Sequence, residues 1–329
     1  MKYPKVGIVS KPYLREMGGG WNEYAVISGR INDLVANNDG IPIGITNVTA
    51  RENLNSDDCL DSYVLSDKEK EQIDSQLEGL DGVILQGGLE THAYEEYIAK
   101  KAMEQRLPVM GICAGFNNII RASGGTTFKS EDGSHDQDPY KIAHKIEIVP
   151  GTNLAKLLGG EREVGVNSVH TILATPDGVP QDKLKVVALT SDGLVEAIEG
   201  QNGVPIYGYK FHPEMMATRG LDCYDSRMEN LFTDFLDKCR DYQRSKAEEP
   251  SRQELEAEVE RLKSELKDGQ NKLDVLEKEN QGLKTRLVGV RNFMTKKCSK
   301  IPFVGRMLLN AMKKELGENQ LSEPKSIDD

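Results

Sequence analysis

Short apolar runs alternate with stretches of helical spacing across residues 1–244, and this alternation restricts the possible folds more than any other feature. Four runs have the length of buried strands, and they lie at 6–9, 41–45, 82–85 and 108–112. The stretches between them have helical spacing, and they lie at 22–36, 67–77 and 91–105. Strands that alternate with helices form a parallel sheet covered by helices on both faces. We therefore predict an α/β fold.

A second group of short apolar runs follows, at 145–149, 164–166, 185–189, 194–198 and 206–210. Residues 225–240 then return to helical spacing, with one apolar face. That face consists of Met228, Leu231, Phe232, Phe235 and Leu236. We expect this helix to complete the domain, whose architecture we predict to be a flavodoxin-like, mostly parallel sheet sandwiched by helices.

The composition changes near Ser245, where a polar stretch at 245–252 is typical of a linker. Beyond it, apolar residues recur every 3.5 positions over 253–294, a period whose natural product is a left-handed coiled coil. The d positions are Leu255, Leu262, Gly269, Leu276, Leu283 and Val290, and the a positions are Val259, Leu266, Leu273, Asn280, Leu287 and Met294. We predict a C-terminal coiled-coil helix after the α/β domain at 1–244.

A lone asparagine at an a position, here Asn280, favours a parallel two-stranded pairing. In such a pair, a g residue faces the e residue five positions later on the partner, which sets Glu258 opposite Lys263 and Glu279 opposite Lys284. We therefore expect a homodimer through residues 255–294. The alternative is a solvated single helix that folds back on the first domain, although such a helix has no need of a strict 3.5 period.

Charge and composition indicate which partners the protein can bind and in which compartment it is expected. The formal net charge of −11 argues against nucleic acid as a partner. The five cysteines are scattered, with no C-x-x-C pair, and neither a secretory signal nor a long apolar run is present, so we expect a cytoplasmic protein. The tail at 295–329 begins basic and amphipathic, which fits contact with its own protein, another protein or an anionic membrane, and it ends in a segment expected to be disordered.

The strongest local signal is Gly111-Ile112-Cys113-Ala114-Gly115, where an apolar run ends and a helical pattern begins. This is the cysteine counterpart of a strand-turn-helix nucleophile elbow. Glycines flank the nucleophile because the turn is sharp and a Cβ atom two residues on either side would clash. The positive end of the following helix favours the reactive thiolate, although a buried cysteine is more often simply a small apolar residue.

Two further signals agree with a cysteine nucleophile. His212 and Glu214 lie two residues apart, so on an extended segment both would point the same way, and the carboxylate could orient the imidazole as a base. A strand ending in Gly87-Gly88 exposes backbone N–H groups, and with the N–H of Ala114 these suit an oxyanion. Taken singly, the first motif is more commonly a surface ion pair, and the second could be a plain tight turn.

The order of these motifs, with V-N-S-V-H at 166–170 between them, resembles the class I glutamine amidotransferase-like family. More narrowly, it is similar to the gamma-glutamyl hydrolase branch, cysteine peptidase family C26. The branch features are V-N-S-V-H and S-D-G-L-V-E-A-I-E at 191–199, and the resemblance covers roughly residues 5 to 238.

The resemblance implies a catalytic triad of Cys113, His212 and Glu214, a thioester intermediate and a small gamma-glutamyl amide substrate. It implies an oxyanion hole formed by Gly88 and Ala114, and no cofactor. It also implies a set of substrate-binding residues near the entrance to the site. These are Gly87, Phe116, Asn167, Ser168 and His170.

The family often has arginine, glutamine and Gln-Trp where this chain has Ala114, Phe116 and Lys210-Phe211. We expect no metal, and interpret His135 with Asp136 and Asp138 as part of a solvated loop or a wall of the substrate cleft. The leading function is hydrolysis of gamma-glutamyl amides. The alternatives are a glutaminase component that passes ammonia to a synthase, and an inactive scaffold that acts through its coiled coil.

Overall fold

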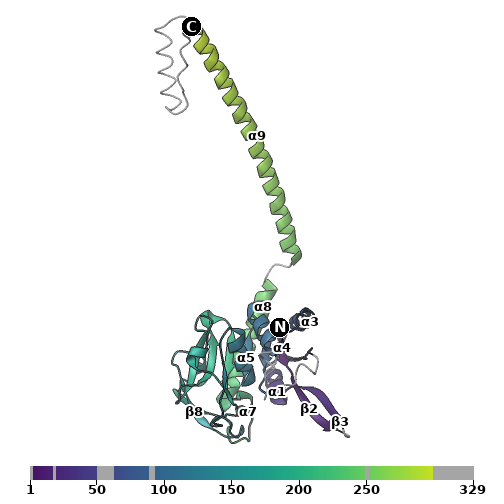
Figure 1. Cartoon of the computed structure of the whole chain (residues 1–329), viewed down its shortest axis with the longest axis vertical. Coiled ribbons are helices and arrows are strands. Elements are labelled where there is room, and N and C mark those ends of the chain that lie inside the picture. The colour runs from purple at the N-terminus through teal and green to yellow at the C-terminus, as the bar shows by residue number, and fades with distance from the viewer. Residues whose placement is uncertain (1–2, 18–19, 50–62, 89–92, 249–251, 299–329) are drawn as a thin grey trace. The chain divides into compact units, whose positions relative to one another are not determined.

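The computed structural model describes residues 3–17, 20–49, 63–88, 93–248 and 252–298. The chain divides into two compact units, residues 1–249 and 250–329 (Figure 1). Most of the tail predicted at 295–329 lies outside the described residues. No helix in the described ranges combines the length and the apolar character needed to cross a membrane.

The first unit is built on a mixed nine-stranded sheet with the strand order β4-β1-β5-β6-β13-β12-β11-β8-β9. Its first five strands run parallel, and they are β4 (Ile41–Ile45), β1 (Lys5–Val9), β5 (Gly82–Leu85), β6 (Val109–Ile112) and β13 (Ile206–Tyr209). The chain passes from β1 to β4 on one side and returns to β5 on the other. This reversal is a topological switch point, and ligands of open α/β sheets bind outside the carboxyl ends of the strands at such points.

The rest of the sheet is antiparallel, and its strands are β12 (Val195–Gly200), β11 (Leu184–Thr190), β8 (His144–Ile148) and β9 (Glu163–Val166). Two small antiparallel pairs lie outside it. They are β2 (Lys11–Met17) with β3 (Gly20–Val26), and β7 (Phe128–Lys129) with β10 (Ile172–Leu173). The α/β class predicted from the sequence is confirmed, with a sheet that is parallel at one end and antiparallel at the other.

Helices pack on both faces of the sheet. One core cluster includes residues of α3 (Asp67–Leu77), α4 (Ala93–Glu104) and α5 (Ala114–Ala122), and the other includes residues of α1 (Gly29–Asn37), α6 (Asn153–Leu157), α7 (Pro213–Met216) and α8 (Glu229–Glu248). Neighbouring residues of β5 alternate between the clusters, because Val83 and Leu85 belong to the first and Ile84 to the second. The central strands are therefore buried on both sides, which accounts for their continuous apolar runs.

One expected helix is partly wrong. The stretch at 22–36 was expected to be helical throughout, but its first residues belong to β3 and helix α1 begins only at Gly29. Strands β2 and β3 pair over seven positions, from Lys11 opposite Val26 to Met17 opposite Gly20. Near the other end of the unit, α8 continues to Glu248, so residues 245–248 of the expected linker are helical.

The second unit contains the single long helix α9 (Arg252–Cys298), which spans the stretch predicted as a coiled coil (Figure 1). Its apolar a and d side chains are exposed within one chain. Exposed fractions between 47% and 65% are found for eight of these side chains. They are Val259, Leu266, Leu273 and Leu287 at a positions and Leu262, Leu276, Leu283 and Val290 at d positions. The helix is confirmed, and its pairing with a second chain stays a prediction.

Candidate active site

The candidate catalytic residues lie just after the carboxyl ends of two neighbouring parallel strands. Strand β6 ends at Ile112, directly before Cys113, and β13 ends at Tyr209, three residues before His212. The two strands pair with Ile112 opposite Tyr209, and the N–H of Cys113 donates a hydrogen bond of 2.8 Å to the carbonyl of Tyr209. Strand register therefore brings together two motifs that are about a hundred residues apart in the sequence.

Cys113 occupies a strained turn between β6 and α5. Its φ of 51° lies in the left-handed region, which is unusual for a residue other than glycine. A Cβ atom on Gly115 would lie 2.0 Å from the carbonyl oxygen of Leu85, and one on Gly111 would lie 2.5 Å from the carbonyl oxygen of Gly115. The predicted reason for the flanking glycines is confirmed, and backbone strain at a sharp turn of this kind is typical of a nucleophile elbow.

His212 and Glu214 form the second part of the site. The Nδ1 atom of His212 lies 2.8 Å from Oε1 of Glu214, and both side chains are buried. The expected contact is present, but the expected extended backbone is not, because Glu214 belongs to the first turn of α7 and His212 precedes it. The carboxylate fixes a proton on Nδ1 and leaves Nε2 as the atom that can exchange a proton with a thiol.

Asn167, which was expected to lie near the substrate entrance, is fully buried and holds the backbone of His212. Its Oδ1 accepts a 2.9 Å hydrogen bond from the N–H of His212, and its Nδ2 donates to the carbonyl of His212 at 3.4 Å. The same amide also donates to the carbonyl of Pro139 at 2.7 Å. Asn167 therefore positions the imidazole through its main chain.

Gly87 lies between the thiol and the imidazole. A Cβ atom added at Gly87 would lie 2.6 Å from Cε1 of His212 and 3.3 Å from Cβ of Cys113. The side chains of Cys113 and His212 thus approach the same small volume from different strands. Only glycine leaves that volume free, which explains the residue type just after the end of β5.

The charges of the site favour a thiolate and an imidazolium. Burial raises the pKa of Cys113, but the positive charges of His212 and Lys210 more than offset this effect and lower it to about 7. Burial lowers the pKa of His212, whereas Glu214 and Cys113 together raise it well above its usual range. Both shifts favour a thiolate–imidazolium pair, which is the reactive form of cysteine nucleophiles in general.

Lys210 is a charged residue of the site that the sequence indicates only as a departure from the family. Its side chain is fully buried, and Nζ donates a 3.0 Å hydrogen bond to Oδ1 of Asn117. The ammonium also lies 5.7 Å from the ring centroid of Phe116, a predicted substrate-binding residue that is itself buried. Burial lowers the pKa of Lys210, while Cys113 and Glu196 act to raise it.

The two predicted oxyanion donors lie at the borders of the site. Ala114 is the first residue of α5, so its N–H is among those for which a helix offers no internal acceptor. Gly88 packs against the side chain of Lys11, because a Cβ atom there would lie 2.8 Å from Cε of that lysine. Lys11 in turn forms a buried ion pair with Glu95. The role of both N–H groups stays a prediction.

Ser168 and His170 lie together, and they contact His135. The Oγ atom of Ser168 donates to the carbonyl of His135 at 2.6 Å and lies 3.1 Å from Nε2 of His170. The interpretation of His135 as a member of a solvated loop is wrong for its side chain, since His135 is 6% exposed whereas Asp136 and Asp138 are exposed. Instead, His135 lies beside His144 and Glu196, and the three form a group with the residue types of a metal site.

The sequence of the chain matches known proteins over the domain that carries this site. The profile of the family described as Peptidase C26 matches residues 6–214. The gamma-glutamyl-gamma-aminobutyrate hydrolase PuuD of Escherichia coli is 29% identical over 173 residues, which cover 43% of this chain and 67% of that hydrolase. The gamma-glutamyl-gamma-aminobutyrate hydrolase of Shigella flexneri is 32% identical over 129 residues, 36% of this chain and 50% of that protein.

A relative with a different name is similar over a comparable length. A glutamine-hydrolyzing GMP synthase subunit of Methanothermobacter thermautotrophicus is 31% identical over 163 residues, 49% of this chain and 75% of that protein. The crystal structure of a protein assigned as a GMP synthase subunit from Thermoplasma acidophilum superposes with a TM-score of 0.50 at 20% identity, over 74% of this chain and 98% of that one. This structural likeness supports the fold. Because the family profile covers more than half of the chain, the protein belongs to the Peptidase C26 family of class I glutamine amidotransferase-type hydrolases.

Proposed function

We propose that this chain hydrolyses gamma-glutamyl amide bonds, with Cys113 as the nucleophile and His212 as the acid and base. The observation that carries the proposal is the buried thiol with a pKa of about 7 beside an imidazole hydrogen-bonded to Glu214. A thiolate of this kind attacks amide carbonyls, and an adjacent imidazolium supplies the proton that an amine needs to leave. The names of the similar hydrolases support a gamma-glutamyl substrate.

In the proposed mechanism, the reaction has two halves. The thiolate of Cys113 adds to the gamma-carbonyl carbon, and the negative oxygen lies against the N–H groups of Gly88 and Ala114. The carbon–nitrogen bond then breaks, His212 gives its proton to the departing amine, and a thioester remains. In the second half, His212 takes a proton from water, hydroxide adds to the thioester, and the carbon–sulfur bond breaks, which releases glutamate and restores the thiolate of Cys113 beside protonated His212.

A gamma-glutamyl anilide tests this proposal directly, because release of the aromatic amine is visible by absorbance. Cys113→Ala should lower the rate of amine release by at least about 1000-fold, since it removes the nucleophile. Cys223→Ala is the matched control, because Cys223 is also a buried free cysteine but burial raises its pKa. Equal amine release from wild type and Cys113→Ala would overturn the proposal, and no turnover or thiol labelling of wild type would favour the scaffold.

A second candidate is a glutaminase component that supplies ammonia to a synthase. The similarity to a protein named as a glutamine-hydrolyzing part of GMP synthase favours it. The two functions differ in their leaving amine and in their need for a partner. Glutamine hydrolysis that appears only when a synthase is added would support the glutaminase, whereas Cys113-dependent hydrolysis of the anilide by the chain alone supports the hydrolase.

We also propose that α9 pairs with the same helix of a second chain. The a and d side chains form an exposed apolar stripe with a strict 3.5-residue period, and a stripe of this kind requires a partner in water. Asn280 at an a position and the oppositely charged g and e residues favour a parallel pair of identical helices.

Asn280→Leu tests the pairing, because the asparagine restricts the number of strands that can associate. The molar mass from light scattering should show a dimer for the wild type and a shift toward larger assemblies for the variant. Asn271→Leu, at an f position on the outer side of the helix, should leave the dimer unchanged. A monomeric wild type at micromolar concentration would refute the pairing.

A further inference from the structure

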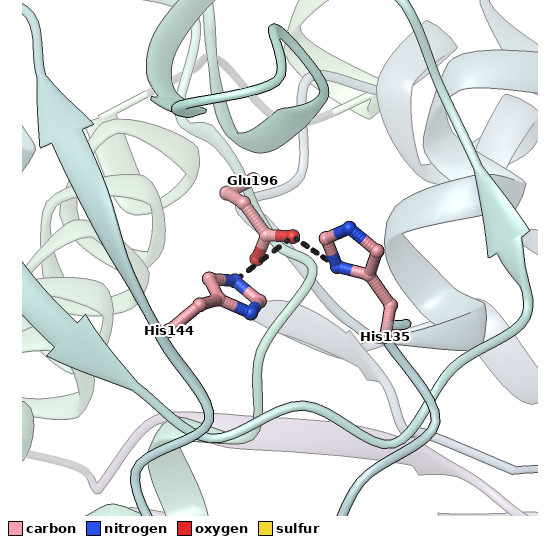
Figure 2. Close-up of side chains that lie close together, drawn as sticks. All are labelled: His135, His144 and Glu196. Carbon is pink, nitrogen blue, oxygen red and sulfur yellow. Dashed lines mark ion pairs between the residues drawn. The ribbon is translucent and has the colours of Figure 1, made fainter. Parts of the chain in front are cut away.

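A group of three metal-ligating side chains lies beside the candidate active site. Atoms of His135, His144 and Glu196 that can bind a metal ion all lie within 4.8 Å of one another (Figure 2). The three residues come from separate parts of the fold, because His144 begins β8, Glu196 lies in β12 and His135 precedes β8 in a loop. Their convergence is therefore a property of the folded chain.

The polar atoms of this group are buried and lack hydrogen-bond partners among the described residues. They include Nδ1 of His135, Nε2 of His144 and both carboxylate oxygens of Glu196. The side chain of Glu196 is only 1% exposed. Buried polar atoms of native proteins are almost always paired, and an unpaired buried carboxylate is especially costly. Buried atoms without hydrogen bonds on three residues that lie this close together indicate a ligand that the three residues share.

The separations fit a cation better than direct hydrogen bonds. Oε1 of Glu196 lies 3.9 Å from Nδ1 of His135 and 3.6 Å from Nε2 of His144, beyond hydrogen-bond length in both cases. Tetrahedral zinc with bonds of roughly 2.0 to 2.1 Å separates its ligand atoms by roughly 3.3 Å. The three atoms lie within 4.8 Å of one another, so a bound ion would draw them closer together by up to about 1.5 Å.

We propose that Nδ1 of His135, Nε2 of His144 and the carboxylate of Glu196 bind a divalent transition-metal ion of the zinc type. Two imidazoles and one carboxylate are a ligand set suited to zinc, and three protein ligands leave the fourth position of the ion for water or a substrate group. This site is separate from the triad, so it goes beyond the proposed hydrolase function.

The surroundings of the group orient the ring of His135. Asp192 lies 3.5 Å from Nε2 of His135, so its carboxylate favours the tautomer with a proton on Nε2 and leaves Nδ1 as the metal-binding atom. A carboxylate on the far nitrogen is a common companion of metal-binding histidines. The carbonyl of His135 accepts hydrogen bonds from Ser168 and from the N–H of His170, which hold the loop in place.

Two neighbours of the group have other partners. Nε2 of His170 lies 3.6 Å from Glu196 but also 3.1 Å from Oγ of Ser168, and the ring of His170 stacks on His135 with centroids 5.3 Å apart. The ammonium of Lys210 donates to Asn117 and leaves both oxygens of Glu196 without a hydrogen bond. The proposed ligands are therefore the three residues drawn in Figure 2.

Isothermal titration with Zn²⁺ tests the site on the full chain after treatment with a chelator. The Cys113→Ala background removes the catalytic thiol, which could itself bind zinc. We expect one ion per chain, a higher unfolding temperature with zinc, and binding weakened by at least about tenfold in His144→Ala and in Glu196→Gln. Asp192→Asn should weaken binding less than either ligand variant.

Glu163→Gln is the matched control, because Glu163 pairs with Lys145 on the exposed side of the neighbouring strands and lies outside the group. It should bind zinc as the parent chain does. Circular dichroism establishes that each variant is folded before it is titrated, and His144→Ala changes the most exposed ligand. The proposal would be overturned if the parent chain did not bind zinc. It would also be overturned if folded His144→Ala and Glu196→Gln bound zinc as tightly as the parent chain does.

Discussion

The thiol of Cys113 is buried, as are those of Cys223 and Cys239, yet its charge state differs from theirs. Burial raises the pKa of both Cys223 and Cys239, whereas the pKa of Cys113 falls to about 7. The difference comes from His212 and Lys210, whose positive charges favour the thiolate. Reactivity in this chain therefore depends on neighbouring charge, and exposure alone would not distinguish the three cysteines.

This electrostatic argument predicts a pH dependence of thiol labelling. The rate of alkylation of Cys113 by iodoacetamide should rise with pH and reach half its plateau near pH 7, because only the thiolate reacts. Glu214→Gln removes the charge that raises the pKa of His212, so His212 loses its proton at lower pH. The negative charge of Glu214 itself raises the pKa of Cys113, but the effect of His212 on that pKa is larger, so the midpoint for Cys113 moves upward. Mass spectrometry of the labelled peptide across a pH series measures both midpoints. A midpoint that stays the same in Glu214→Gln would contradict the argument.

The space between the catalytic side chains gives a second prediction. Gly87→Ala places a methyl group 2.6 Å from Cε1 of His212, so the imidazole must leave its position beside Cys113 or the backbone must shift. We expect the rate of anilide hydrolysis to fall by about 100-fold or more, because a small misplacement of a catalytic group has an effect of this size. Gly29→Ala is the control, since a Cβ atom there meets no neighbouring atom. The two variants should have similar melting curves, but Gly87→Ala should hydrolyse the anilide much more slowly than Gly29→Ala. An unchanged rate of hydrolysis in Gly87→Ala would contradict the crowding argument.

The sequence predicted Cys113, His212 and Glu214 because each belongs to a short motif whose spacing has a chemical meaning. The same reasoning did not bring together His135, His144 and Glu196. Each of them is a single polar residue, and they become neighbours only through the pairing of β8, β11 and β12. The signal that could have indicated Glu196 is a carboxylate in the otherwise apolar run of β12, where every neighbour from Val195 to Ile198 is buried.

At the scale of elements, the central strands were predicted because burial on both faces demands continuous apolar runs. Strands β2 and β3 were missed because their sequence has no continuous apolar run. They form a separate two-stranded sheet, and the segment mixes charged, polar and aromatic residues without a continuous run. Gly18-Gly19 between them is a hairpin signal in the sequence, but the helical spacing around residues 22–36 favours the competing interpretation.

Helix α3, whose limits of Asp67 and Leu77 were predicted from the sequence, begins with a capping box. The Oγ atom of Ser66 accepts from the N–H of Glu69 at 3.3 Å, and the carboxylate of Glu69 accepts from the N–H of Ser66 at 2.8 Å. Ser66→Ala should lower the free energy of unfolding by about 1 kcal/mol, the usual value of such a cap. Ser75→Ala, on the exposed side of the same helix, should change it little. Urea denaturation measures both, and equal effects would show that the cap contributes nothing particular.

At the scale of the whole molecule, the two units differ in how they satisfy their apolar residues. The first unit, residues 1–249, encloses two core clusters of its own on the two faces of the sheet. Helix α9 has no such core within one chain, since its described apolar a and d side chains are exposed. Stability of the first unit should therefore be independent of the second, whereas stability of the second depends on association with another chain.

Truncation after Glu249 separates these contributions. Residues 1–249 should unfold cooperatively within a few degrees of the full chain's main transition, because both core clusters remain. The truncated protein should also keep the midpoint of Cys113 labelling near pH 7, since every residue that sets this pKa lies in the first unit.

Light scattering should give the mass of one chain for the truncated protein and of two for the full chain. The full chain should show an additional helical transition that moves to higher temperature with concentration, as mass action requires of a dimer. A truncated protein that remains dimeric would place the interface in the first unit and refute the role assigned to α9.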